Sequence, residues 1–319
     1  MDYSKQLKAI LNASGWTQED LAKQLGVSFV TLNSWVNARS RPRKRALESI
    51  RILYFDVLGA DSLDVGYFEE LKEKIEPLSI KLPQITENKE VFDKLILYLT
   101  YHTNVIEGST MTLDDTREVL FENRTLTNRT QIEQAEARNH KAALVWLLGA
   151  LQSKSFVIDE GLIKGLHLRL MNGIIENAGL YRSHSVRIMG AHVTVANHLK
   201  IPELVQGLLT KINVEIKRNE IIEKLSETHA VFEKIHPFSD GNGRVGRLLM
   251  LAQALQRSIV PPLVLKERRR AYYKYLELAQ TQDNLMPLQL FMAESIVAAN
   301  ELLFKYQMGA DRIRTGLKK

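Results

Sequence analysis

The chain has 319 residues, which is long enough for two or three domains and a sizeable hydrophobic core. Its 45% hydrophobic and 25% charged residues are ordinary for a soluble globular protein, and with no signal pattern and no apolar run of membrane length we expect a cytoplasmic protein without a membrane partner. Cysteine is absent, which excludes disulfides, a thiol nucleophile and cysteine metal sites, while the net charge of +6 allows a nucleic-acid partner without requiring one.

Residues 1–57 predict a small helical module. A first apolar helix is expected to end near Gly15, and Thr17-Gln-Glu-Asp20 has the spacing of a capping box that starts a second helix. Gly26 then interrupts the chain, and Ser28 can cap a third helix. A helix, a short glycine-containing turn and another helix form the helix-turn-helix pattern.

This module closely resembles the repressor-type helix-turn-helix family over Thr17-Gln-Glu-Asp-Leu-Ala-Lys-Gln-Leu-Gly-Val-Ser-Phe-Val-Thr-Leu-Asn-Ser-Trp-Val-Asn37. The resemblance implies that the third helix enters the DNA major groove, with four candidates for contacts to base edges: Ser28, Phe29, Thr31 and Asn33. Five of the seven residues at 39–45 are basic and would suit DNA phosphates, and the candidate contacts are Arg39, Arg41 and Arg43. A solvated basic loop, or a helix-turn-helix kept only for protein contacts, is the alternative.

Residues 58–90 lack a clean periodic pattern and are predicted to be a linker between two modules. Glycines and prolines punctuate this segment at Gly59, Gly66, Pro77 and Pro83. A short amphipathic helix is expected between them, over 69–75.

The apolar pattern becomes helical again from Val91, where we expect a second domain to begin, and we expect a basic tail over 306–319. Residues 109–176 predict several helices, one of them starting at the capping box Thr112-Leu-Asp-Asp115.

The stretch 185–195 differs in its residue pattern from the helical segments around it. Its residues are β-prone on both sides of Gly190, which predicts a hairpin within an otherwise helical domain. His167 lies on an amphipathic helix before this hairpin, and we interpret it as structural because nothing near it in the sequence completes a site.

A helix predicted over 221–235 leads into the most informative stretch, His236-Pro-Phe-Ser-Asp-Gly-Asn-Gly-Arg-Val-Gly-Arg247. Gly241 and Gly243 can adopt backbone angles that let consecutive N–H groups converge on an anion, at the start of another predicted helix. Arg244 and Arg247, three residues apart on one helix face, suit phosphate oxygens. These features together predict a polyphosphate site.

Two further groups in the same stretch indicate what happens to that phosphate. His236 can take a proton near neutral pH, and Asp240 is an oxygen ligand suited to a magnesium ion that also binds phosphates. A base, a metal carboxylate and a phosphate cradle together indicate nucleotide transfer onto a hydroxyl. A surface histidine before a glycine-rich turn would explain single members of this group but not the whole set.

Every fixed position of the stretch matches the signature of Fic-domain proteins, His-Pro-Phe-x-Asp-Gly-Asn-Gly-Arg-x-x-Arg. Most members of that family transfer AMP from ATP to a protein hydroxyl. The resemblance extends over about 91–305 and implies an all-α fold, with a Fic-type helical core and a β-hairpin flap, here preceded by a small N-terminal helix-turn-helix bundle. It also implies ATP as a substrate and Mg²⁺ on Asp240.

The resemblance implies a set of ATP-binding residues. From the flap come Met189, Gly190, Ala191 and His192; from the signature come Asp240, Gly241, Asn242, Gly243, Arg244, Val245, Gly246 and Arg247; and from a later helix come Tyr272, Tyr273 and Gln280. Gln280 departs from the family, which more often has asparagine at that position. The flap is expected to clamp the target protein by adding a strand to it.

Thr103, Glu107 and Gly108 match the inhibitory-helix motif of the same family, Ser/Thr-x-x-x-Glu-Gly/Asn. In the class that carries this helix before the fold, the glutamate pairs with the last arginine of the signature, here Arg247, which would otherwise hold the γ-phosphate of ATP. One guanidinium can bind a carboxylate or a phosphate in this way but not both. We therefore expect Glu107 to lie at the ATP site, with the inhibitory helix ending near residue 108 and a weakly active resting enzyme.

The implied reaction starts when a target Ser, Thr or Tyr hydroxyl enters under the flap and loses its proton to the catalytic His236. The hydroxyl then attacks the α-phosphate of ATP, and pyrophosphate leaves. The protein would also modify itself, and Glu107 can position a water for removal of AMP. Gly243 favours nucleotidyl transfer over phosphorylation, which is carried out by relatives with lysine at that position.

The alternative hypothesis is a DNA-binding transcriptional regulator whose Fic core only senses ATP. Retention of the base His236 argues against it, because a sensor has no need of a base. The target protein, the sequence of any DNA site and the oligomeric state, including a homodimer, stay open.

Overall fold

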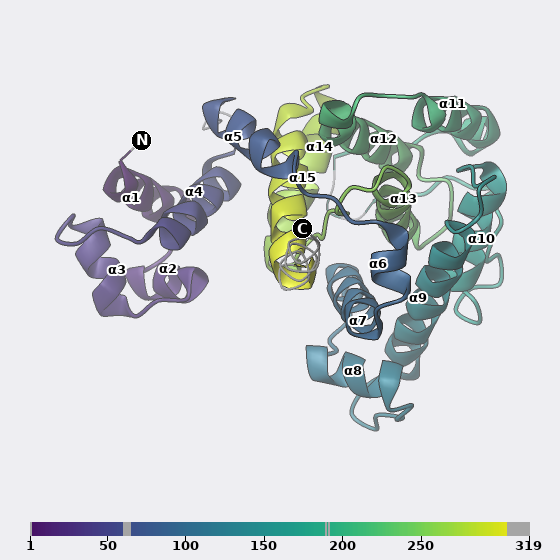
Figure 1. Cartoon of the computed structure of the whole chain (residues 1–319), viewed down its shortest axis with the longest axis horizontal. Helices are drawn as coiled ribbons and strands as arrows, with labels where there is room; N and C mark the ends of the chain where they lie inside the picture. Colours follow the sequence, from purple (N-terminus) through teal and green to yellow (C-terminus); the bar gives the residue numbers. More distant parts are fainter. Residues whose placement is uncertain (1, 60–64, 189, 191, 305–319) are drawn as a thin grey trace, which may run out of the picture. The chain divides into compact units, whose positions relative to one another are not determined.

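In a computed structural model of the chain, the structure describes residues 2–59, 65–188, 190 and 192–304. The chain divides into two compact units, Met1–Tyr67 and Phe68–Lys319, which are considered separately here (Figure 1). Over the described ranges the regular structure is helical, apart from one isolated bridge between Ser79 and Ile259, so the predicted all-α fold is confirmed. None of the described helices is long and apolar enough to cross a membrane.

The first unit is a helical bundle built around one apolar core. Over residues 2–59 its four helices are α1 (Tyr3–Ser14), α2 (Gln18–Leu25), α3 (Phe29–Val36) and α4 (Lys44–Leu58). The core side chains that are completely buried come from all four helices and are Leu7, Ile10, Leu21, Leu32 and Ile50.

The predicted helix-turn-helix consists of α2 and α3. Thr17 and Asp20 form the predicted capping box at the start of α2, and Gly26 ends this helix in the left-handed conformation, with φ 64°. Ser28 then caps α3 by accepting a hydrogen bond from the Thr31 N–H. These local signals fix the turn between the two helices, and the prediction from the sequence is confirmed.

The second unit contains the remaining helices. The boundary between the units falls within α5 (Val65–Ile75), so part of the segment expected to be a linker is helical, and α6 follows at Leu82–Thr86. The later helices are α7 (Lys89–Ile106), α8 (Leu113–Phe121), α9 (Gln131–Ala150), α10 (Glu160–Leu170), α11 (Ile201–Asn213), α12 (Ile221–Ile235), α13 (Asn242–Gln256), α14 (Arg269–Thr281) and α15 (Met286–Ala299), with short 3-10 turns at His198–Lys200, Arg218–Glu220 and Lys266–Arg268 and a π-helical turn at Asn300–Phe304.

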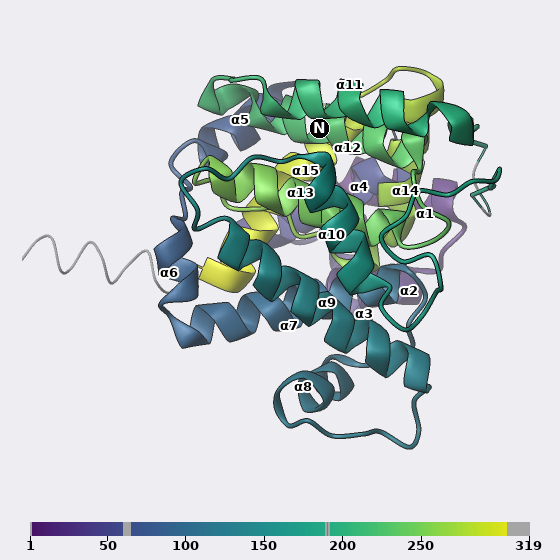
Figure 2. The same ribbon diagram turned by 90° about the vertical axis from the view of Figure 1, so that its right-hand side faces the viewer.

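Helices α12 and α13 pack side by side at the centre of this unit and are joined by the short loop 236–241. Gly246 permits the close approach, because a Cβ there would lie 2.5 Å from Glu233 Oε1 and 2.9 Å from His229 Cε1. Helix α7 packs against α9 and also contacts α13, and Figure 2 shows α9 running beside α7, with α8 at one end. The ends of α7 and α12 and the start of α13 are thereby held together.

The β-hairpin predicted at 185–195, called the flap segment below, is not present as a pair of strands in its described part, 185–188, 190 and 192–195. Its backbone turns at Gly190, where φ is 77°. Ser185 and Arg187 are exposed, whereas Val186 and Ile188 are half-buried. A two-stranded hairpin is marginal in water by itself, and the polar outer face offers no apolar cross-strand pairs to stabilise one.

Candidate active site

Helix α12 ends where His236 adopts the left-handed conformation, with φ 50°, which is uncommon for a residue other than glycine. The imidazole Nδ1 lies 3.2 Å from the Glu233 carbonyl oxygen, which can only accept, so Nδ1 carries the proton and Nε2 is left with a lone pair. Burial is the main cause that lowers the pKa of His236 below its ordinary value of 6.5, and the positive charge of Arg182 acts in the same direction. The ring is therefore a neutral base at neutral pH.

The loop after His236 turns through Gly241, the N-cap of α13, at φ 76°. Asn242 holds this turn in shape, because its side-chain amide accepts a hydrogen bond from the Phe238 N–H and donates one to the Phe238 carbonyl, both at 2.9 Å. Its side chain is thus committed to the loop. The first N–H groups of α13 have no intrahelical partner and carry the positive end of the helix dipole, which favours an anion.

Gly243 is needed for a different reason from the one expected. It lies inside the first turn of α13 and does not use a positive φ. A Cβ at Gly243 would instead lie 2.5 Å from Glu107 Oε1 and 3.1 Å from Arg247 Nη1. The glycine makes room for these two side chains, so the prediction of a second left-handed glycine was wrong.

Arg244 and Asp240 flank the start of α13. Arg244 is buried, its Nη1 donates to Glu136 Oε1 at 2.7 Å, and its Nη2 lies 3.8 Å from Asp240 Oδ2. The Asp240 side chain is 64% exposed, and its Oδ1 accepts a hydrogen bond from the Gly241 N–H at 2.6 Å. Glu136 was missed by the sequence analysis, because no local pattern connects it with an arginine so far along the chain.

A magnesium ion fits this site only in company with phosphates. The described residues contain no group of three or more His, Asp or Glu side chains able to hold a metal ion. Magnesium is commonly bound through one or two carboxylates together with phosphate oxygens and waters. The single exposed carboxylate of Asp240 suits that mode.

The second arginine of the site, Arg247, contacts the end of α7. Its Nε donates to Thr103 Oγ1 at 2.6 Å, its Nη2 pairs with Glu107 Oε1, and its Nη1 has no hydrogen-bond partner among the described residues. The Arg247 side chain is 9% exposed and that of Glu107 is 28% exposed. Burial alone would lower the pKa of Arg247, but attraction to Glu107 outweighs it and raises the pKa. Gly108, with φ 113°, then turns the chain away from α7.

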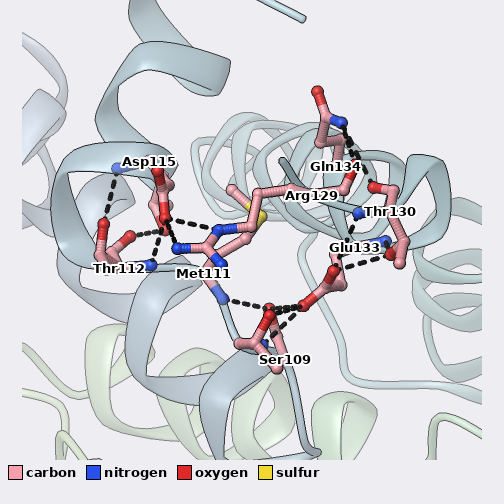
Figure 3. Close-up of polar contacts among 10 residues, drawn as sticks. Ser109, Met111, Thr112, Asp115, Arg129, Thr130, Glu133 and Gln134 are labelled. Atoms are coloured by element: carbon pink, nitrogen blue, oxygen red, sulfur yellow. Dashed lines mark hydrogen bonds and ion pairs between the residues drawn. The ribbon is translucent and has the colours of Figure 1, made fainter. Parts of the chain in front are cut away.

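The segment after Glu107 is fixed to the start of α9 by one carboxylate (Figure 3). Glu133 accepts hydrogen bonds from the Thr110 N–H at 2.6 Å, the Thr110 hydroxyl at 2.8 Å and the Thr130 hydroxyl at 2.7 Å, with a longer one from Ser109. Burial alone would raise the pKa of Glu133, but these hydrogen bonds outweigh it and lower the pKa to about 2. Glu133 is therefore ionised at every working pH, and the sequence analysis missed this contact.

The residues expected from α14 lie at different depths. The Tyr272 hydroxyl is buried and lies 2.6 Å from His229 Nε2, whereas Tyr273 is more exposed and its hydroxyl donates to the Ile106 carbonyl at 3.4 Å. Gln280 is buried and its amide donates to the Ala230 carbonyl at 3.2 Å. Gln280 therefore ties α14 to α12.

The remaining predicted residues of the site are placed as follows. Val245 points into the core and its N–H bonds to the Gly241 carbonyl, while Gly246 faces α12. Gly190 and His192 are exposed in the flap segment, and the predictions for Met189 and Ala191 lie outside the described residues.

His167 braces the same loop, as its structural interpretation required. Its Nδ1 accepts from the Gly179 N–H at 2.8 Å, so its Nε2 donates to the Asp240 carbonyl at 3.0 Å, and the ring stacks on Phe238 with a 3.7 Å centroid separation. Burial is the main cause that lowers the pKa of His167 to about 4, so the ring stays neutral.

In the first unit, the candidates for DNA contact differ in how free they are. Phe29 is 47% exposed, but the Ser28 hydroxyl is engaged with Thr31, and the Asn33 amide donates to Gln18 Oε1 at 3.1 Å. Val30 is 76% exposed and thus more exposed than Phe29. The sequence analysis missed it as a candidate for DNA contact, although it lies at the start of α3. The three candidate phosphate contacts are exposed: Arg39, Arg41 and Arg43.

Two family models match the chain. The model of the Fic/DOC family matches residues 157–254, and a helix-turn-helix model matches residues 7–53. Among curated proteins, a protein adenylyltransferase Fic from Nematostella vectensis is 33% identical over 261 residues, or 79% of this chain and 56% of that protein. A protein of the same name from Aedes aegypti is 27% identical over 239 residues, or 73% of this chain and 47% of that protein. The chain thus spans about half the length of the curated relatives it matches.

Solved structures share the fold. A Fic domain containing signaling protein from Bacteroides thetaiotaomicron is 20% identical, with a TM-score of 0.63 over 77% of this chain and 98% of that chain. Fic-1 (residues 134–508) from C. elegans is 23% identical, with a TM-score of 0.63 over 91% of this chain and 86% of that chain. The chain therefore contains a Fic/DOC family domain, with a helix-turn-helix domain N-terminal to it.

Proposed function

We propose that this chain is a protein adenylyltransferase that transfers AMP from ATP to a Ser, Thr or Tyr hydroxyl of a target protein and of itself. The observation that carries the proposal is that the short loop 236–241 holds a neutral histidine, His236, and an exposed carboxylate, Asp240, directly before the arginine-bearing N-terminus of α13. The name that the curated relatives carry supports the same reaction.

The chemistry follows from the direction of each group. His236 accepts the proton of the target hydroxyl at Nε2, since its Nδ1 is committed to the Glu233 carbonyl. The first N–H groups of α13 hold phosphate oxygens and stabilise the charge that develops as the hydroxyl bonds to the α-phosphorus and pyrophosphate leaves. Arg244, whose Nη1 is bound to Glu136, adds its positive charge at the same helix end. Magnesium bound to Asp240 and the phosphates would neutralise part of that charge.

The resting enzyme is proposed to be inhibited by Glu107. Its carboxylate lies against Arg247 and in the space left by Gly243, so it competes for the guanidinium that would bind the γ-phosphate. We also propose that the same carboxylate orients a water for removal of AMP. Movement of Glu107 away from Arg247 is the step that would allow productive ATP binding.

DNA binding by the first unit is a second proposed function. It is supported by two exposed features, the apolar start of α3 at Phe29 and Val30 and the arginines that follow the end of this helix, Arg39, Arg41 and Arg43. A gel shift of pooled genomic fragments at two salt concentrations tests it. Binding that weakens at the higher salt supports phosphate contacts, and no shift even at the lower salt removes DNA as a partner.

The transfer reaction is tested with two variants of the full chain and ATP labelled at the α-phosphate. Glu107→Gly is expected to label itself, and adding His236→Ala to it is expected to abolish labelling while equilibrium dialysis shows unchanged ATP binding. Labelling that survives the loss of His236 would overturn the assignment of the base.

A further inference from the structure

Arg182 is a buried arginine whose side chain donates, among the described residues, only to backbone carbonyls. Its Nε donates to the His236 carbonyl at 2.7 Å, and its Nη2 reaches the Ile235 carbonyl at 3.4 Å. Its Nη1 donates to the His184 carbonyl at 2.7 Å, and Nη2 also donates to the Ala196 carbonyl at 2.6 Å. Its own N–H donates to the Pro237 carbonyl at 3.0 Å.

These carbonyls belong to two functional parts of the second unit. His184 and Ala196 stand at the two ends of the flap segment, one residue before it and one after it. The carbonyls of 235–237 belong to the end of α12 and to the loop that carries the catalytic base. A second tie runs from the Ala196 N–H to the Lys234 carbonyl at 3.1 Å. One guanidinium therefore joins both ends of the flap segment to the backbone of the base.

The site of attachment is a strained one. A residue other than glycine in the left-handed region persists only where its surroundings hold it there, and His236 has φ 50°. A planar guanidinium with several fixed donors is suited to this task, since it can bind three separate backbone segments in one geometry. A lysine ammonium at the same place lacks that fixed fork.

We propose that Arg182 is a positioning residue for the transfer reaction, which sets the orientation of His236 and the place of the flap segment through one set of hydrogen bonds. This inference rests on the proposed adenylyl transfer. The target hydroxyl docks under the flap segment and gives its proton to His236, so a shift of either relative to the other separates the reacting atoms.

The charge of Arg182 adds a second, separable effect. Burial and the cation of Arg182 lower the pKa of His236, whereas the nearby carboxylates of Glu107 and Asp240 raise it. Without the cation, the protonated His236 ring is no longer repelled by a nearby positive charge, so the pKa of His236 rises. The ring then becomes a neutral base only at higher pH. The acidic limb of the pH–rate profile should then move to higher pH.

Two substitutions separate geometry from charge, both made in the Glu107→Gly background and assayed by α-labelled ATP. Arg182→Lys keeps the charge but loses the fork, and is expected to lower the maximal rate about 100-fold with ATP binding unchanged and the acidic limb in place. Arg182→Gln is expected to lower the rate similarly and to move the acidic limb to higher pH.

A matched control is Arg257→Gln. Arg257 also donates only to backbone carbonyls in the described structure, those of Gln253, Ile212 and Val214, but it lies at the far end of α13. We expect this variant to lose thermal stability without a change in the pH profile. The Arg257→Gln variant thus shows what is expected when an arginine only stabilises the fold.

The outcomes distinguish the two hypotheses. If Glu107→Gly with intact Arg182 fails to label, the proposed function is wrong. If it labels and both Arg182 variants keep its rate and pH profile, or if both fail to fold, Arg182 is structural only and the positioning role is refuted.

Discussion

The pair formed by Glu107 and Arg247 leads to a prediction that can be worked through from the structure. Glu107→Gly removes the carboxylate that competes with ATP for Arg247. Glu107 caps the end of α7 with φ −81° and ψ −2°, a conformation that glycine also adopts, so the backbone has no reason to change. The effect should therefore report on the ion pair rather than on the fold.

The magnitude follows from burial. The Arg247 side chain is 9% exposed and Glu107 is 28% exposed, so water screens their interaction only in part. A hydrogen bond to a charged group contributes about 1.5–3 kcal/mol. Since about 1.4 kcal/mol corresponds to a factor of ten, loss of the pair should raise the rate at low ATP by about 10- to 100-fold. Glu107→Gln keeps the size and an acceptor but not the charge, and should give a smaller increase.

The assay is the initial rate of self-labelling from α-labelled ATP across a range of ATP concentrations, with the increase expected mainly as a lower KM for ATP. Glu122→Gly is a matched control, because Glu122 also caps a helix, α8, with φ −101° and ψ −1° but pairs with Arg124 at the surface. This control should behave as the unaltered chain does. Equal rates for Glu107→Gly and Glu122→Gly would refute the competition between carboxylate and phosphate.

Three further predictions concern the surroundings of the site. Glu133→Gln weakens the hydrogen bonds that hold Thr110, so it should loosen the segment after Glu107 and raise self-labelling about tenfold in the otherwise unaltered chain. If Glu133→Gln also raises self-labelling in the Glu107→Gly background, its effect does not act through Glu107. Gly246→Ala places a Cβ 2.5 Å from Glu233 Oε1 and should destabilise the fold by about 1–3 kcal/mol, whereas Gly207→Ala in α11 meets nothing within 4 Å and should not lower the melting temperature. Burial is the main cause that raises the pKa of Glu233 from 4.5 to about 8. Between pH 4.5 and about pH 8 the folded state therefore keeps a proton on Glu233 that the unfolded state has lost, so the stability falls as the pH rises through this range. Glu233→Gln should make that fall less steep, and an unchanged slope of melting temperature against pH would contradict the assignment.

The sequence predicted best what depends on local signals. The capping boxes at Thr17 and Thr112 and the end of α12 at Ile235 follow from neighbouring residues, and the structure confirms them. The contact between Glu107 and Arg247 was expected only through a family resemblance, because no spacing connects residues so far apart. The predicted β-hairpin rested on β-propensity and on the family resemblance, and neither one supplies the cross-strand contacts that pair two strands.

The supporting residues could not be predicted in the same way. Arg182 binds carbonyl oxygens, which every residue has, so its partners leave no trace in the choice of side chains. Glu136 and Glu133 contact segments that the fold brings to the start of α9. Gly243 was correctly singled out, but for a different reason from the one expected, because the glycine is needed to make room for the side chain of Glu107 on another helix.

The most direct test of the account compares ATP labelled at the α-phosphate with ATP labelled at the γ-phosphate, using Glu107→Gly and its version carrying His236→Ala. Protein adenylyl transfer predicts covalent label from the α-position only, and none when His236 is absent. Label that arrives from the γ-position would contradict it, because the chain would then transfer a phosphoryl group and not AMP.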